Sequence, residues 1–161
     1  MVLPLVLLLS VATAQVDPWD EDAVEEHDED RDRILVSAWG GNAWETGTRG
    51  GGSFPLAGGE IAYAFDSIDV GLAGYGYRLP DEANPWTPVV LLRAINRFDT
   101  GSGLEATFGF GLGAARPDDW EAWFQVALGF RLDLGPAFVG GELSFEQFDV
   151  LRLAGGVGVK F

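Results

Sequence analysis

The amino-acid sequence predicts an all-β fold, an eight-stranded antiparallel up-and-down β-barrel. Three observations predict it: apolar and polar residues alternate over long segments, turn signals separate those segments, and no helical period of comparable length occurs. We expect strands at 33–44, 58–66, 68–78, 87–98, 103–115, 119–133, 136–147 and 150–161. Most segments have about the ten residues that a tilted strand needs to cross a bilayer, whereas globular strands average about five or six.

The first fourteen residues are predicted to be a cleavable signal peptide. Val2–Ala12 is an apolar run of signal-peptide length, too short for a transmembrane helix. Small residues at 12–14 then favour cleavage before Gln15. No Lys or Arg precedes the run, which departs from the usual pattern. The alternative is a buried strand or helix at the N-terminus.

Residues 15–32 are predicted to form an acidic disordered tail. Ten of the chain's 25 acidic residues lie there, and such a segment repels itself and buries little apolar surface. Asp28, Asp30 and Asp32 alternate as in a calcium loop, but the turning Gly and the distal Glu are missing, so no metal site is expected. The net charge of −15 excludes nucleic acid as a partner, because phosphate binding needs a basic face.

Residues 33–161 are predicted to be the barrel, and alternation is clearest in its C-terminal half. In 119–133 one face reads Trp120, Ala122, Phe124, Val126, Leu128, Phe130 and Leu132, and the other carries Glu121, Gln125 and Arg131. The first and third segments alternate less cleanly. Short turns at 66–67, 99–102 and 134–136 are expected on the periplasmic side, and connections at 45–57, 79–86, 116–118 and 147–149 outside.

Side-chain volume indicates which face meets lipid. The apolar face carries bulky residues, whereas the opposite face carries Gly109, Gly111, Gly113, Gly156 and Gly158. Small residues suit the hollow of a narrow barrel, so we expect the bulky face to point outward into lipid. The full prediction is therefore an eight-stranded antiparallel up-and-down transmembrane β-barrel.

Aromatic residues on the apolar face fall near the predicted strand ends. Such rings form the interfacial girdles of transmembrane barrels. The candidates are Trp86 and Trp120 at the outer ends, and Phe65, Phe98, Phe130 and Phe161 at the periplasmic ends. The alternative is that these rings belong to the core of a β-sandwich.

The last nine residues, 153–161, resemble the C-terminal strand of outer-membrane β-barrel proteins. They alternate apolar positions through Val157 and Val159 and end in Phe161. The chain looks most like the small OmpA/OmpX-type barrels. The resemblance implies a location in the cell outer membrane after export, and outer-membrane lipid as surroundings. It also implies the barrel-assembly machinery as a partner that reads this strand.

Charges on the predicted inner face nearly balance, with six acids and five bases, as expected if charges removed from water must pair. Register predicts Glu105 beside Arg97 and Arg131, and Glu146 opposite Arg152. We expect these pairs to plug the lumen; a small gated conduit is the alternative. The whole set is Glu60, Asp69, Arg93, Arg97, Glu105, Glu121, Arg131, Glu142, Glu146, Arg152 and Lys160.

The sequence predicts no enzyme, no cofactor and no metal. Outer-membrane hydrolases use a histidine beside a serine or an acid, and the predicted barrel contains no histidine. This argument does not exclude a lipid A palmitoyltransferase, because the small barrel of that enzyme hides its catalytic groups. The leading hypothesis is a structural or surface-interaction role through the segments 45–57 and 79–86. The alternatives are passage of small apolar solutes by an OmpW-like barrel, marked by an apolar lumen pocket, and a soluble secreted ligand-binding β-barrel.

Overall fold

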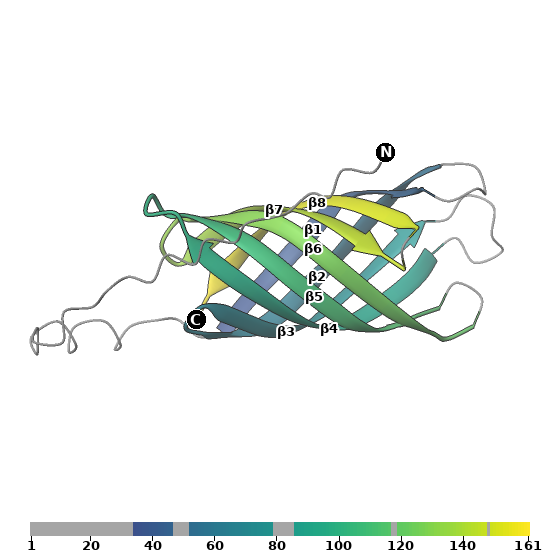
Figure 1. Ribbon diagram of the computed structural model, residues 1–161, viewed down its shortest axis with the longest axis horizontal. Helices are drawn as coiled ribbons and strands as arrows, with labels where there is room; N and C mark the ends of the chain where they lie inside the picture. Colours follow the sequence, from purple (N-terminus) through teal and green to yellow (C-terminus); the bar gives the residue numbers. More distant parts are fainter. Residues whose placement is uncertain (1–33, 47–51, 79–85, 117–118, 148) are drawn as a thin grey trace, which may run out of the picture. The chain divides into compact units, whose positions relative to one another are not determined.

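The computed structural model describes residues 34–46, 52–78, 86–116, 119–147 and 149–161. These residues form one closed antiparallel barrel in the order β1-β2-β3-β4-β5-β6-β7-β8 (Figure 1). The strands are β1 (Ile34–Glu45), β2 (Ser53–Phe65), β3 (Ile68–Arg78), β4 (Trp86–Asp99), β5 (Leu104–Ala115), β6 (Glu121–Asp133), β7 (Ala137–Glu146) and β8 (Val150–Lys160). Among the described residues, no helix is long and apolar enough to cross a membrane.

The first and last strands close the barrel. β1 pairs with β8 from Leu35 opposite Lys160 to Glu45 opposite Val150. At the end of this seam, Ile34 and Phe161 exchange two backbone hydrogen bonds of 2.9 Å. Closure leaves no strand edge to pair with another chain, which removes the aggregation hazard of an open sheet.

The predicted fold class, eight strands in an antiparallel barrel, is confirmed. Strand β3 matches its predicted bounds, and six other strands differ from theirs by no more than two residues at either end. The second strand was predicted wrongly, because it begins at Ser53 rather than at residue 58. The connection expected at 45–57 includes this segment, yet Pro55 lies in the ladder opposite Asn42, and Phe54 and Leu56 are buried.

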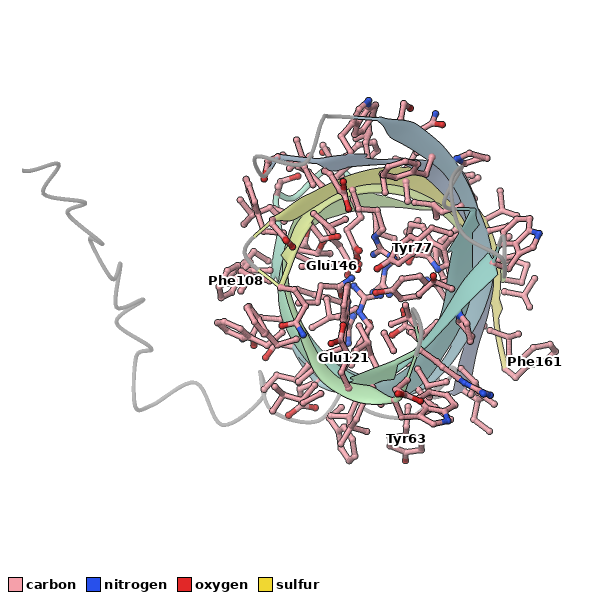
Figure 2. The ribbon with its side chains drawn as sticks, turned by 90° about the vertical axis from the view of Figure 1, so that its right-hand side faces the viewer. Tyr63, Tyr77, Phe108, Glu121, Glu146 and Phe161 are labelled. Carbon is pink, nitrogen blue, oxygen red and sulfur yellow. The ribbon has the colours of Figure 1, made fainter. Side chains whose placement is uncertain are left out.

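Strand alternation sorts side chains into an outer apolar surface and an inner face. Figure 2 looks along the barrel, with Tyr63, Phe108 and Phe161 outside the ring of strands and Tyr77 and Glu146 inside it. Large apolar side chains are exposed on every strand or directly beside it, and Leu112 reaches 70% exposure. Such a continuous apolar surface is typical of a protein that faces lipid.

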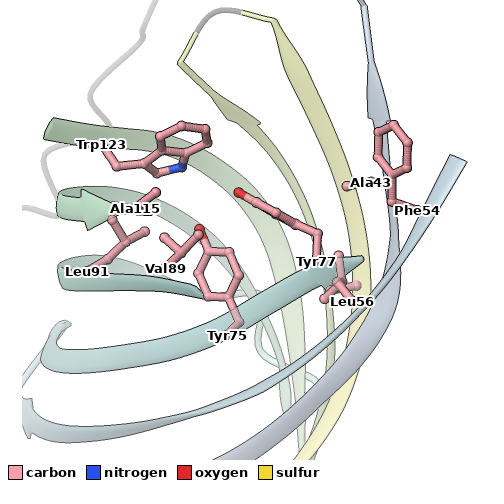
Figure 3. Close-up of a cluster of buried hydrophobic side chains, with 10 residues drawn as sticks. Ala43, Phe54, Leu56, Tyr75, Tyr77, Val89, Leu91, Ala115 and Trp123 are labelled. Carbon is pink, nitrogen blue, oxygen red and sulfur yellow. The ribbon is translucent and has the colours of Figure 1, made fainter. Parts of the chain in front are cut away.

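The inner face is bulkier than predicted. Besides glycines it carries buried Phe54, Leu56, Tyr75, Tyr77 and Trp123, which form one apolar cluster (Figure 3). The glycines make this possible, because a β-carbon at an inward glycine would meet a neighbouring ring or strand. Small residues therefore provide space for aromatic rings inside the barrel, as well as suiting its curvature.

Candidate functional site in the barrel lumen

Five buried charged side chains form a chain of alternating sign across the lumen. Arg93 donates to Glu60 at 2.6 Å and also to Glu142. Arg152 in turn donates to Glu142 and lies 3.3 Å from Glu146. The five residues come from β2, β4, β7 and β8, so the chain crosses the hollow from wall to wall. We call it the central chain.

Glu146 ends the central chain and accepts several hydrogen bonds. Its side chain is fully buried, and Tyr77, Trp123 at 3.0 Å and Gln125 at 2.7 Å donate to it. Charge-assisted bonds of this kind stabilise an ionised carboxylate inside a protein. Sequence reasoning missed the three donors. For Tyr77, the alternation of side chains along β3 would have indicated the donor. Tyr77 lies an even number of positions from Asp69 and therefore on the same face of the strand.

Four further charges form a closed ring of ion pairs nearer the other end of the lumen. Asp69 lies 3.0 Å from Arg97 and 2.9 Å from Arg131, while Glu105 lies 3.3 Å from Arg97 and 2.6 Å from Arg131. Glu105 stands directly opposite Arg131 in the ladder, whereas Arg97 is two positions away diagonally, opposite Thr107. We call this group the end ring.

Two residues of the expected network lie outside both groups. Lys160 pairs with Asp133 at the rim. Glu121 is exposed and forms no ion pair within the described part of the chain, so its predicted place in the network is wrong. The β6–β7 ladder begins only at Gln125 opposite Glu146, and Glu121 therefore extends past the end of β7.

Aromatic and aliphatic side chains fill the lumen on the far side of the central chain from the end ring. Tyr75, Tyr77 and Trp123 pack edge to face or at a tilt, and the Arg152 guanidinium lies 4.6 Å from the centre of the Tyr75 ring. This aromatic layer contacts the central chain directly. The described lumen thus contains three layers: aromatic, central chain and end ring.

A small cavity remains beside the central chain. Its volume is about 50 Å³, and its lining includes Glu60 and Glu142 of the central chain and Asp69 and Arg131 of the end ring. Water has space there, since one molecule needs roughly 10–15 Å³.

Solved structures share this architecture. The chain is similar to Neisserial surface protein A, with a TM-score of 0.68 at 16% identity over 83% of this chain and 100% of that one. It is also similar to the N-terminal β-barrel domain of Pseudomonas aeruginosa OprF, with a TM-score of 0.61 at 19% identity over 83% and 100%. A de novo designed transmembrane β-barrel matches with a TM-score of 0.63 at 12% identity over 83% and 98%.

The chain has the fold of a small transmembrane β-barrel. The sequence-based resemblance to the OmpA/OmpX type is thereby confirmed at the level of fold. No protein-family model matches the chain, and no curated protein matches it either.

The two ends of this transmembrane barrel carry the predicted aromatic residues. Trp86 begins β4 and Trp120 immediately precedes β6, so both lie at the end where even-numbered strands start. The other four, Phe65, Phe98, Phe130 and Phe161, lie toward the end where even-numbered strands finish. All six side chains are exposed. Val157 and Val159 are also exposed, on the outer face of β8.

One serine of the inner face lies beside a buried carboxylate. Ser144 accepts a hydrogen bond from Arg152 at 2.9 Å and lies beside Glu146, but its side chain is fully buried. The described strands contain no histidine, and none of their acidic residues form a group of three that could hold a metal ion. A buried serine between an arginine and a carboxylate is explained by hydrogen bonding within the wall.

Proposed function

We propose that this chain is an exported, integral outer-membrane protein with a structural or surface-interaction role, a closed lumen and no catalytic activity. The observation that carries the proposal is the difference in side chains between the outer and the inner face of the barrel. The outer face is apolar on every strand, and the inner face is filled by paired charges and rings.

The outer face supports insertion into a bilayer. Phe110, Leu112 and Leu128 expose more than half of their side chains, and they lie on neighbouring strands β5 and β6. Water penalises a contiguous apolar surface of this extent, whereas lipid does not. A soluble ligand-binding barrel places its apolar face inside and a polar face outside, so the outer surface weighs against that alternative.

The filled lumen supports a closed barrel. Three layers of side chains cross it, and the cavity beside the central chain measures about 50 Å³. Ligand pockets typically measure roughly 300–1,000 Å³, so an apolar solute would have to displace the aromatic layer. This weighs against an OmpW-like passage and against a permanently open conduit.

Export and assembly complete the proposal. The proposed signal peptide, residues 1–14, and the acidic tail, 15–32, lie outside the described residues. The barrel-assembly machinery would read the exposed Val157, Val159 and Phe161 on the last strand. The proposed contact segments lie partly outside the described residues as well, at 47–51 and 79–85.

Ion conductance across a planar lipid bilayer tests the closed lumen. Refolded barrel, with insertion verified by protection from added protease, should give no steady large current. A reproducible open level comparable with that of a general porin would contradict the closed lumen. The same preparation tests the membrane assignment, because a barrel that stays in the aqueous phase would contradict insertion.

A further inference from the structure

The buried charges of the lumen do not cancel. The central chain and the end ring contain five carboxylates and four guanidinium groups, which leaves one negative charge in excess. Arginine keeps its proton in proteins, and the rim pair of Lys160 and Asp133 is neutral as a pair. An uncompensated charge in a buried site is costly, so a partner for it is expected.

Contacts locate the excess charge at Glu60. Glu142 has an arginine on each oxygen, Glu146 has Arg152 and four further donors, and each acid of the end ring meets two arginines. Glu60 meets Arg93 alone, through Oε2, and its side chain is only 7% exposed. Its other oxygen, Oε1, has no hydrogen-bond partner among the described residues.

The cavity lies beside this carboxylate. Glu60 lines the cavity together with Asp69, Arg131 and the hydroxyl residues Ser37 and Thr107, and most of the remaining lining is apolar, including Leu35 and Phe138. A volume of about 50 Å³ accommodates about three to five water-sized particles, at roughly 10–15 Å³ each. The cavity therefore combines oxygen ligands, excess negative charge and space for a small hydrated particle.

We propose that the lumen binds one small monovalent cation, such as sodium, beside Glu60 with part of its water shell. Hard cations prefer carboxylate, hydroxyl and water oxygens, which this cavity offers. A divalent ion fits less well, because the buried charges of the central chain and the end ring leave a single negative charge in excess. Organic amines larger than a few atoms exceed the space.

The end ring gives the cation its route. Side chains of Arg97, Glu105 and Arg131 are 10–16% exposed, whereas those of the central chain are at most 7% exposed. Water therefore reaches the end ring more readily, and the aromatic layer closes the opposite side. The site is a dead end and is compatible with the closed lumen. The cation site depends only on the geometry of the lumen, and it does not require the surface-interaction role proposed above.

Urea unfolding of the full chain in detergent micelles tests the proposal. The urea midpoint, followed by tryptophan fluorescence, should be higher in sodium chloride than in choline chloride at equal ionic strength. It should rise further as sodium replaces choline, because a ligand of the folded state stabilises it. Glu60→Gln keeps the size of the side chain and removes the excess charge, so the difference between the two salts should vanish.

Glu121→Gln is the matched control, since it makes the same change at an exposed carboxylate and should retain the sodium effect. Equal wild-type midpoints in the two salts would overturn the proposal. If those midpoints instead change with pH alone, a proton on Glu60 neutralises the excess charge and no cation site exists.

A second measurement needs no variant. The sodium NMR line should broaden in the presence of folded wild-type barrel and narrow again when urea unfolds it. An unchanged line would overturn the cation site even if Glu60→Gln failed to fold. Neither result would alter the conductance test of the closed lumen.

Discussion

The glycines of the barrel differ in whether packing requires them. A β-carbon at Gly113 would overlap the carbonyl oxygen of Val90 on the neighbouring strand, and one at Gly158 would overlap the ring of Phe138. At the outward-facing Gly74, by contrast, a β-carbon would have nothing within 4 Å. The requirement for glycine is therefore local and follows from what stands opposite.

Gly113→Ala should destabilise the barrel, while Gly74→Ala should not. The first change forces β4 and β5 apart, and overpacking of this kind costs about 1–3 kcal/mol. The second reduces the freedom of the unfolded chain and should be neutral or stabilising by up to about 1 kcal/mol. Free energies of unfolding from urea titrations check both, and equal effects would contradict the local account.

Glu146→Ala should be among the most damaging single changes in the lumen. It leaves buried donors of Tyr77, Trp123 and Gln125 without their acceptor and removes one carboxylate partner of Arg152. Breaking a buried charged pair costs roughly 3–5 kcal/mol. The urea free energy should fall by about that amount, whereas Glu121→Ala at an exposed site should change it by no more than about 0.5 kcal/mol.

At the scale of elements, β8 combines two tasks on opposite faces. Its inner face supplies Arg152 to the central chain, and its outer face exposes Val157 and Val159. Phe161 closes the seam with β1 through its backbone, while its side chain is 67% exposed. The ring of Phe161 therefore contributes little to the packing of the folded barrel.

Phe161→Ala should lower assembly into the outer membrane without lowering the stability of the folded barrel. Because the backbone hydrogen bonds to Ile34 remain, the refolded variant should unfold within about 0.5 kcal/mol of the wild type. In cells, however, its level in the outer membrane should fall if the assembly machinery reads the terminal ring. Membrane fractionation compares the levels, and a normal level would contradict the proposed assembly signal. Val36→Ala, also exposed and apolar, is the control.

At the scale of the whole molecule, the barrel places its apolar surface on the convex side. Leu128 lies near the middle of β6, between Phe108 on β5 and Leu143 on β7, and all three belong to the outer row. In a soluble protein an exposed leucine tolerates a charge. In a bilayer the same position faces hydrocarbon.

Leu128→Arg should therefore destabilise the barrel in liposomes. A charge near the bilayer midplane costs about 2–4 kcal/mol in transmembrane barrels, whereas Leu128→Ala should cost less. Urea unfolding in liposomes measures both. Heat-modifiability gels provide the matching test of closure, since folded barrel should migrate differently before and after boiling. An Arg variant as stable as the Ala variant would contradict lipid contact.

Contacts between neighbouring strands were predictable from the sequence. Side chains alternate with a period of two, and short turns set the register of adjacent strands, so Glu105 could be placed beside Arg131 from residue positions alone. The start of β2 was not predictable in this way, because Pro55 is typical of a loop although the β1–β2 ladder extends to Ser53 opposite Trp44.

By itself, then, the sequence determined the number of strands, the apolar outer face and most of the charges of the inner face. Only the tertiary structure decided which of those charges meet across the hollow. Arg93 joins Glu60 and Glu142 from strands that are not its neighbours, and Tyr77 on β3 reaches Glu146 on β7. Alternation and turns act between adjacent strands, whereas contacts across the lumen depend on the tilt and stagger with which the whole sheet closes.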